Sequence, residues 1–84
     1  MPTLRGFGGR AVVGYQTAAT LRRWRRDGDR VTFEVARWEP FWRDQPVTAL
    51  EVPIGRHYYR WPVVGGSVAQ GDVEVGVAVC LGDA

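Results

Sequence analysis

Apolar and polar residues alternate along most of this chain. Over residues 30–38, Val31, Phe33 and Val35 fall on one face, and the residues between them fall on the other. A two-residue repeat places alternate side chains on opposite faces of a β-strand, whereas an amphipathic helix needs apolar residues three and four positions apart. The pattern therefore predicts a strand over residues 30–38.

Other stretches show the same strand-like pattern, separated by groups of glycine, proline and aspartate. They span residues 47–52, 56–64 and 72–81, with one or two more strands within residues 10–26. Residues 17–26 are the only stretch that could form a helix, and they lack an apolar helical stripe. Five to six short strands predict an all-β fold, either a small antiparallel barrel or a sandwich. We expect one domain over residues 11–84, with residues 1–10 as a flexible N-terminal arm that drapes over a neighbouring subunit.

A hairpin rich in arginine is expected around residues 27–28, because Asp-Gly is favoured in the two-residue type I′ turn. With this pair as the turn, Arg25 lies opposite Arg30, and Arg23 shares their outer face. Arg26 is expected at the rim of the apolar face, with its charged end in water. The outer arginines form either a solvated strand face or a basic surface that binds phosphates or an acidic protein.

Aromatic residues are concentrated in residues 38–42 and 56–61. Two prolines in residues 39–46 exclude a central strand there and predict a loop that carries large aromatic side chains. Those rings either cap one end of the barrel, protrude as a binding hot spot, or stack on bases. Residues 56–61 carry aromatics on both faces, which favours a strand covered on both sides, for example by a neighbouring subunit. The predicted protein interface comprises Trp38, Phe41, Trp42, Tyr58, Tyr59 and Trp61.

Composition narrows the range of functions. All eleven basic residues are arginine, and nine acidic residues leave a net charge of +2, a milder bias than a strongly cationic nucleic-acid-binding surface shows. The single cysteine, Cys80, is expected to be a small buried apolar residue, and the single histidine, His57, a packed one. No motif places a nucleophile beside a base, and no His/Cys cluster would hold a metal. We therefore expect no enzymatic activity, no cofactor and no metal, and the absence of a long apolar run predicts no membrane span.

Residues 63–84, VVGGSVAQGDVEVGVAVCLGDA, resemble a known family. Their Gly-x-Val-x-x-Gly-Asp-Val-x-Val-Gly pattern is similar to the turn-and-strand pattern of small β-rich capsid decoration proteins of tailed bacteriophages. The resemblance covers about a quarter of the chain. It implies an all-β, non-catalytic virion protein that binds a protein lattice.

These observations predict a non-enzymatic structural protein, most specifically a minor virion component such as a capsid decoration or head/connector protein. Its partners would be a protein lattice or copies of itself, and it would be found in the virion, or in the cytoplasm of the producing cell before assembly. The basic surface, Arg23, Arg25 and Arg30, would meet acidic neighbours. Two alternatives remain open: a small barrel that binds nucleic acid through the arginine-rich hairpin, and a small inhibitor or adaptor of a host protein.

Overall fold

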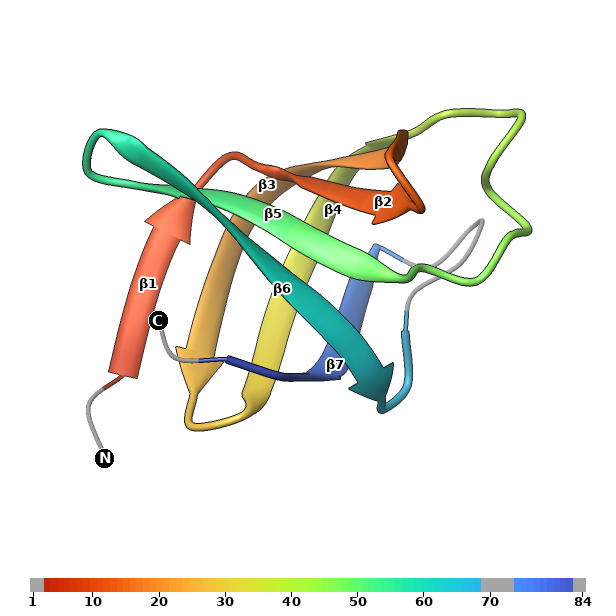
Figure 1. The fold of residues 1–84 in the computed structure, drawn as a ribbon. Coiled ribbons are helices and arrows are strands. Elements are labelled where there is room, and N and C mark those ends of the chain that lie inside the picture. Colours follow the sequence, from red (N-terminus) through yellow and green to blue (C-terminus); the bar gives the residue numbers. More distant parts are fainter. Residues whose placement is uncertain (1–2, 69–73, 83–84) are drawn as a thin grey trace.

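The computed structural model describes residues 3–68 and 74–82, and within them the chain forms strands and no helix (Figure 1). The strands in this part of the chain are β1 (Thr3–Phe7), β2 (Arg10–Val13), β3 (Gln16–Asp27), β4 (Arg30–Trp38), β5 (Ala49–Ile54), β6 (His57–Gly65) and β7 (Val75–Cys80). The region that could have been a helix is the long strand β3. Residues 69–73, which hold the Gly-Asp step of the pattern shared with decoration proteins, lie outside the described residues.

Six of the strands close into an antiparallel barrel in the order β3, β2, β5, β6, β7, β4 and back to β3. Strand β1 is additional and pairs only with β3 among the described strands. It lies beside the half of β3 that ends at Asp27, while β2 pairs with the other half of the same edge. The predicted all-β fold is confirmed, and of the two architectures left open, barrel and sandwich, the structure shows the barrel. Residues 3–7, expected to belong to a flexible arm, instead form an ordered part of the sheet.

Three hairpins share one kind of two-residue turn. Gly14–Tyr15 joins β2 to β3, Gly28–Asp29 joins β3 to β4, and Gly55–Arg56 joins β5 to β6. The three glycines have φ values of 64°, 62° and 63°, and no other residue type has a positive φ among the described residues. Positive φ at the first turn position alone is the property of a type II′ turn, which requires glycine there.

The turn after β3 lies one residue later than expected, which shifts the cross-strand pairing by two residues. Asp27 pairs with Arg30 instead of occupying the turn, so Arg25 lies opposite Thr32 and not opposite Arg30. Arg26 is consequently only 4% exposed, not at the rim. Its guanidinium donates to the Gly28 and Gly82 carbonyl oxygens and stacks over the Trp61 ring at 4.5 Å. Two backbone acceptors and an aromatic face thus replace water around the buried charge.

Large aromatic side chains fill the barrel interior, and small residues face them across the sheet. Trp24 and Trp61 meet edge to face, with ring centroids 5.2 Å apart. On β7, Gly76 lies opposite Phe33, and this face of β7 is buried while the valines of the other face are partly or largely exposed. The bulk of the rings explains this orientation, because valines on the inner face of β7 would compete with them for the same volume.

Candidate interaction surfaces

Two segments distant in sequence bring exposed aromatic rings together. Tyr15, at the tip of the β2–β3 turn, and Phe41, in the loop after β4, are 81% and 80% exposed. Trp42 packs edge to face against Phe41 at a centroid distance of 4.9 Å. These three residues, named here the aromatic patch, line one hollow of about 510 Å³ together with Arg10, Gln16, Thr17, Glu39 and Pro40. Backbone hydrogen bonds within the loop, from the Trp42 N–H to the Glu39 carbonyl and from the Gln45 N–H to the Trp42 carbonyl, both 3.0 Å, shape it.

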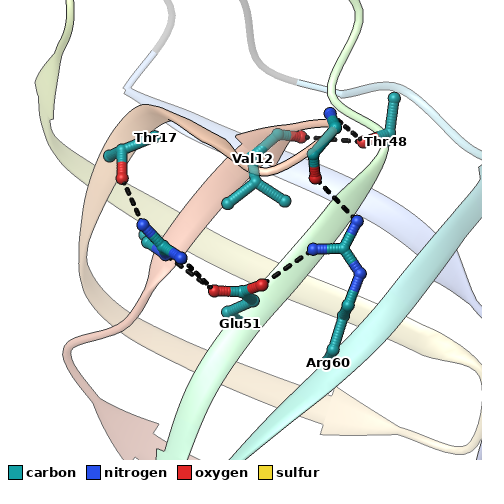
Figure 2. Close-up of polar contacts among 7 residues, drawn as sticks. Val12, Thr17, Thr48, Glu51 and Arg60 are labelled. Carbon is teal, nitrogen blue, oxygen red and sulfur yellow. Dashed lines mark hydrogen bonds and ion pairs between the residues drawn. The ribbon is translucent and has the colours of Figure 1, made fainter.

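A polar network beside the patch fixes the turn that carries Tyr15 (Figure 2). The Glu51 carboxylate, on β5, accepts hydrogen bonds from Arg10 Nε and from Arg60 Nη1, each at 2.7 Å. Arg10 also donates to Thr17 Oγ1, and Arg60 donates to the Gly14 carbonyl oxygen, again at 2.7 Å. One carboxylate therefore connects β2, β5 and β6. Through Arg10 it reaches Thr17 on β3, and through Arg60 it reaches Gly14 in the β2–β3 turn.

Tyr15 is exposed yet held in place. The Arg60 guanidinium lies over its ring at 4.9 Å, and the Gly14 N–H donates to Thr48 Oγ1 at 2.8 Å. The Thr48 hydroxyl in turn donates to the Val12 carbonyl oxygen at 3.2 Å. A ring that is ordered before binding loses less conformational freedom when a partner covers it. The patch is therefore built as a preorganised contact surface.

The network makes one prediction about pH. Burial by itself raises the Glu51 pKa, but the hydrogen bonds and charges of Arg10 and Arg60 outweigh it, so the pKa lies below its ordinary value of 4.5. A lowered pKa gives stability that is present above 4.5 and is lost as the pH falls through the folded-state value. Glu51→Gln is expected to lower the free energy of unfolding by about 1 kcal/mol near neutral pH. Urea unfolding should show this difference shrinking at about pH 3.

Glu74→Gln is the matched control, because this carboxylate is exposed and directly precedes β7, a strand that carries no member of the network. It should change the free energy of unfolding by less than about 0.5 kcal/mol at either pH. A Glu51→Gln effect of equal size at neutral and acidic pH would contradict the assigned role of the charge.

The predicted basic surface lies on the outer face of the sheet, as expected, but two of its charges are already paired. Arg23 Nε is 2.5 Å from a Glu34 carboxylate oxygen, and Arg25 Nε is 3.1 Å from an Asp27 carboxylate oxygen. A hydrogen bond from Thr3, and then the charge of Arg25, lower the Asp27 pKa despite some desolvation. Arg30 is exposed at the end of the same hairpin. The face is thus a mixed-charge surface with a small basic excess.

The same outer face is hollowed where β1, β3, β4 and β7 run side by side. The groove has a volume of about 750 Å³ and is lined by side chains that include Arg5, Arg23, Arg25 and Glu34. Phe7 at its rim is 77% exposed, and Val75, also in its lining, is 49% exposed. An exposed aromatic ring beside arginines is the composition found at binding hot spots. We call this hollow the β1 groove.

The predicted interface residues do not all lie at the surface. Tyr58 is 74% exposed and Tyr59 38%, while Trp61 on the same strand is 1% exposed and belongs to the core. Trp38 ends β4 and packs partly buried against that core. Tyr15 and Phe7 were missed by the sequence reasoning. The signal for Tyr15 was its place after Gly14, since a side chain at the tip of a Gly-x turn points to solvent.

No group of three or more His, Cys, Asp or Glu side chains lies close enough to hold a metal ion within residues 3–68 and 74–82. Cys80 is buried, as expected, and desolvation raises the pKa of its thiol to about 11, so it is a protonated thiol at neutral pH. Nor does the described part of the chain contain a helix long and apolar enough to cross a membrane.

No protein-family model, curated protein or solved structure was found to match the chain. The two surfaces described above are therefore the basis on which its function is inferred.

Proposed function

We propose that this chain is a non-enzymatic structural or adaptor protein that attaches to a larger protein assembly through the aromatic patch. The observation that carries the proposal is the pair of rings, Tyr15 and Phe41, 81% and 80% exposed on one hollow. Single exposed apolar residues are common on soluble proteins, whereas clustered exposed aromatics mark binding sites. Phe7 and Tyr58 are also exposed, but neither lines this hollow, so Tyr15 and Phe41 are set apart by sharing one.

The charges around the patch favour a protein over a nucleic acid. Arg10 and Arg60 are both engaged by Glu51, and Glu39 in the hollow lies 3.8 Å from Arg37. The hollow therefore has no basic excess to attract phosphates, which supply most of the affinity in nucleic-acid complexes. Arg60 is stacked on the Tyr15 ring at the edge of the patch. Aromatic residues and arginine are the types enriched in protein–protein interfaces.

The most specific form of the proposal is a minor virion protein, a capsid decoration or head/connector component. Its support is the sequence pattern of residues 63–84 together with a small all-β fold that presents apolar rings for a neighbour. In that setting the partner is either another virion protein or a second copy of this chain. Tyr58, 74% exposed on β6, adds to the surface available for such contacts.

Photo-crosslinking tests the proposal. A benzophenone analogue of phenylalanine in place of Phe41 should give a discrete protein adduct in the cells that produce the protein, identified by mass spectrometry. Adding Tyr15→Ala should reduce the adduct yield by at least about tenfold, because truncating a hot-spot aromatic costs about 2 kcal/mol or more. The same analogue in place of Val64, which is 56% exposed and does not line the hollow, should give no such adduct.

An adduct with a second copy or with another protein supports the proposal, and the absence of any protein adduct at Phe41 overturns it. Fluorescence anisotropy with labelled single- and double-stranded DNA at two salt concentrations tests the alternative. Binding that collapses as salt rises, together with its loss in an Arg23→Ala, Arg25→Ala double variant, would make the outer arginines a phosphate-binding site instead.

A further inference from the structure

Strand β1 leaves one edge of the sheet open. Among the described strands it pairs with β3 alone and ends the strand order. In an antiparallel pair, residues alternate between pointing their backbone groups at the partner and pointing them away. Asp27 flanks the tight turn, so its backbone N–H and C=O groups point at β4. The backbone groups of Trp24 and Arg26 therefore point at β1, where these two residues pair with Gly6 and Leu4.

The open edge therefore presents the backbone N–H and C=O groups of Thr3, Arg5 and Phe7. The hydrogen bond from the Gly8 N–H to the Arg22 carbonyl, 3.1 Å, agrees with this alternation, because Gly8 continues the inward-bonding set. Three residues with backbone groups aimed outward form a short ladder on which another strand can bond.

The edge is held in position by packing, so it does not depend on a partner for its order. Gly6 lies so close to the Trp24 ring that a Cβ there would be 2.4 Å from Trp24 Cζ2. Leu4 packs against the core, and the Thr3 hydroxyl donates to Asp27 Oδ1 at 2.6 Å. The strand also lacks the proline and the bulge with which natural proteins protect exposed edges.

The side chains beside the open edge indicate what would bind. Thr3, Arg5 and Phe7 share the outer face, where Arg5 lies directly opposite Arg25. Like charges in directly opposed positions destabilise a sheet. The Asp27 carboxylate interacts with both arginines, because the charges of Arg25 and Arg5 each lower its pKa. A further carboxylate next to Arg5 would complete the neutralisation, and an apolar side chain would cover Phe7.

We propose that β1 is the docking edge for an extended segment of a partner protein, which adds a strand to the sheet and places an acidic side chain beside Arg5. In that segment, the residue two positions from the acidic one is apolar and packs on Phe7 at the rim of the β1 groove. The inference rests on the proposed function in one respect, that the partner is a protein. It uses a surface separate from the aromatic patch.

Two other occupants fit the edge less well. A second copy paired through β1 in the central antiparallel register would place Arg5 opposite Arg5. A nucleic acid has no strand backbone to satisfy the open ladder, and Arg23 and Arg25 are already ion-paired on this face. An extended acidic segment meets both the backbone and the charge requirement.

Peptide binding tests the proposal. The probe is a synthetic peptide of about nine residues in which valine and threonine alternate. Glutamate replaces the central valine, so the residues two positions from it are valines on the same face. Isothermal titration should show it binding at least about tenfold more tightly than the same peptide with lysine at the centre. N-methylation of the alternate amides that face β1 should abolish binding, while methylation of the other alternate set should not. Hydrogen exchange should slow at the Thr3, Arg5 and Phe7 amides.

Charge reversal gives the matched variants. Arg5→Glu is expected to invert the preference so that the lysine peptide binds more tightly, and Arg5→Gln to abolish the difference between the peptides. Arg56→Glu reverses an exposed arginine in the β5–β6 turn and should leave the preference unchanged. Circular dichroism of each variant reports whether the barrel is intact.

Each result decides the question. No saturable binding, equal sensitivity to both methylation patterns, or unchanged exchange at the three amides overturns the inference. A β1-dependent dimer, abolished by Arg5→Glu, or salt-sensitive DNA binding at the same amides, overturns it in favour of those occupants. A Tyr15→Ala, Phe41→Ala double variant should retain peptide binding, so failure of the proposed function at the aromatic patch and failure of the docking edge are distinguishable.

Discussion

Replacing Trp61 with alanine is expected to lower the free energy of unfolding by about 3–5 kcal/mol. The ring is 1% exposed, meets Trp24 edge to face at 5.2 Å and carries the Arg26 guanidinium at 4.5 Å. Its loss leaves a cavity and removes the aromatic face from a buried charge. A domain of this length has a total stability of roughly 4–13 kcal/mol, so the loss is a large fraction of the total and the variant should unfold at a much lower urea concentration. Urea denaturation followed by far-ultraviolet circular dichroism measures the change.

Tyr58→Ala is the control on the same strand. Tyr58 is 74% exposed, so its truncation should change the free energy of unfolding by no more than about 0.5 kcal/mol. Trp61→Phe, which keeps an aromatic ring in the core, should fall between the two. If Tyr58→Ala cost as much as Trp61→Ala, the orientation assigned to β6 would be wrong, and the aromatics on its two faces would need a different explanation.

The sequence predicted the strands well because alternation is a local signal. Val31, Phe33 and Val35 alternate and are all buried, as their pattern indicates. The pattern alone does not say which face of β7 is inside, because both of its faces are apolar. The answer depends on what lies opposite: Phe33 occupies the volume, so Gly76 faces inward.

Turn chemistry was the main source of error in the hairpin. The Asp27–Gly28 and Gly28–Asp29 turns overlap in this sequence. They differ by one residue in position, which changes the cross-strand pairing by two residues. The shift changes each cross-strand partner by two residues, so the side chains keep their faces. Arg26 now lies opposite Val31 in the core, and Arg25 lies opposite Thr32 instead of Arg30. Local propensity favours a turn at Asp27–Gly28. The turn that forms, Gly28–Asp29, places Trp24 opposite Phe33, and both rings are buried.

The candidate site was only partly predictable. For Phe41, in a proline-flanked loop, the sequence left open whether the ring caps the barrel or protrudes, and the ring is exposed. Tyr15 lies more than twenty residues away in sequence. It reaches the same hollow because β3, which begins directly after Tyr15, pairs with β4, which ends shortly before Phe41. Trp61 looked like a surface residue in an aromatic-rich strand, and the alternation of β6 turned it inward. The open edge of β1 was missed because a strand of five residues with two glycines nearby resembles an arm.

Gly9→Ala is expected to lower the free energy of unfolding by at least about 2 kcal/mol, through backbone strain and crowding together. Gly9 lies at the bend between β1 and β2 with a φ of 98°, a conformation that residues with a side chain rarely adopt. A Cβ there would lie 2.6 Å from the Glu51 carbonyl oxygen and 3.1 Å from Val52 Cα. Both contacts are backbone atoms of β5, so neither can move aside without distorting the barrel. Urea denaturation again measures the effect.

Gly14→Ala separates the two causes. Gly14 also has a positive φ, 64°, but nothing lies within 4 Å of a Cβ built there. Its substitution should cost about 1 kcal/mol, from strain alone. The excess cost at Gly9 then measures how tightly the bend is packed on β5. If the two variants were equally destabilised, the bend would be loosely packed, and β1 would not be held by it in the position that leaves Thr3, Arg5 and Phe7 open for pairing.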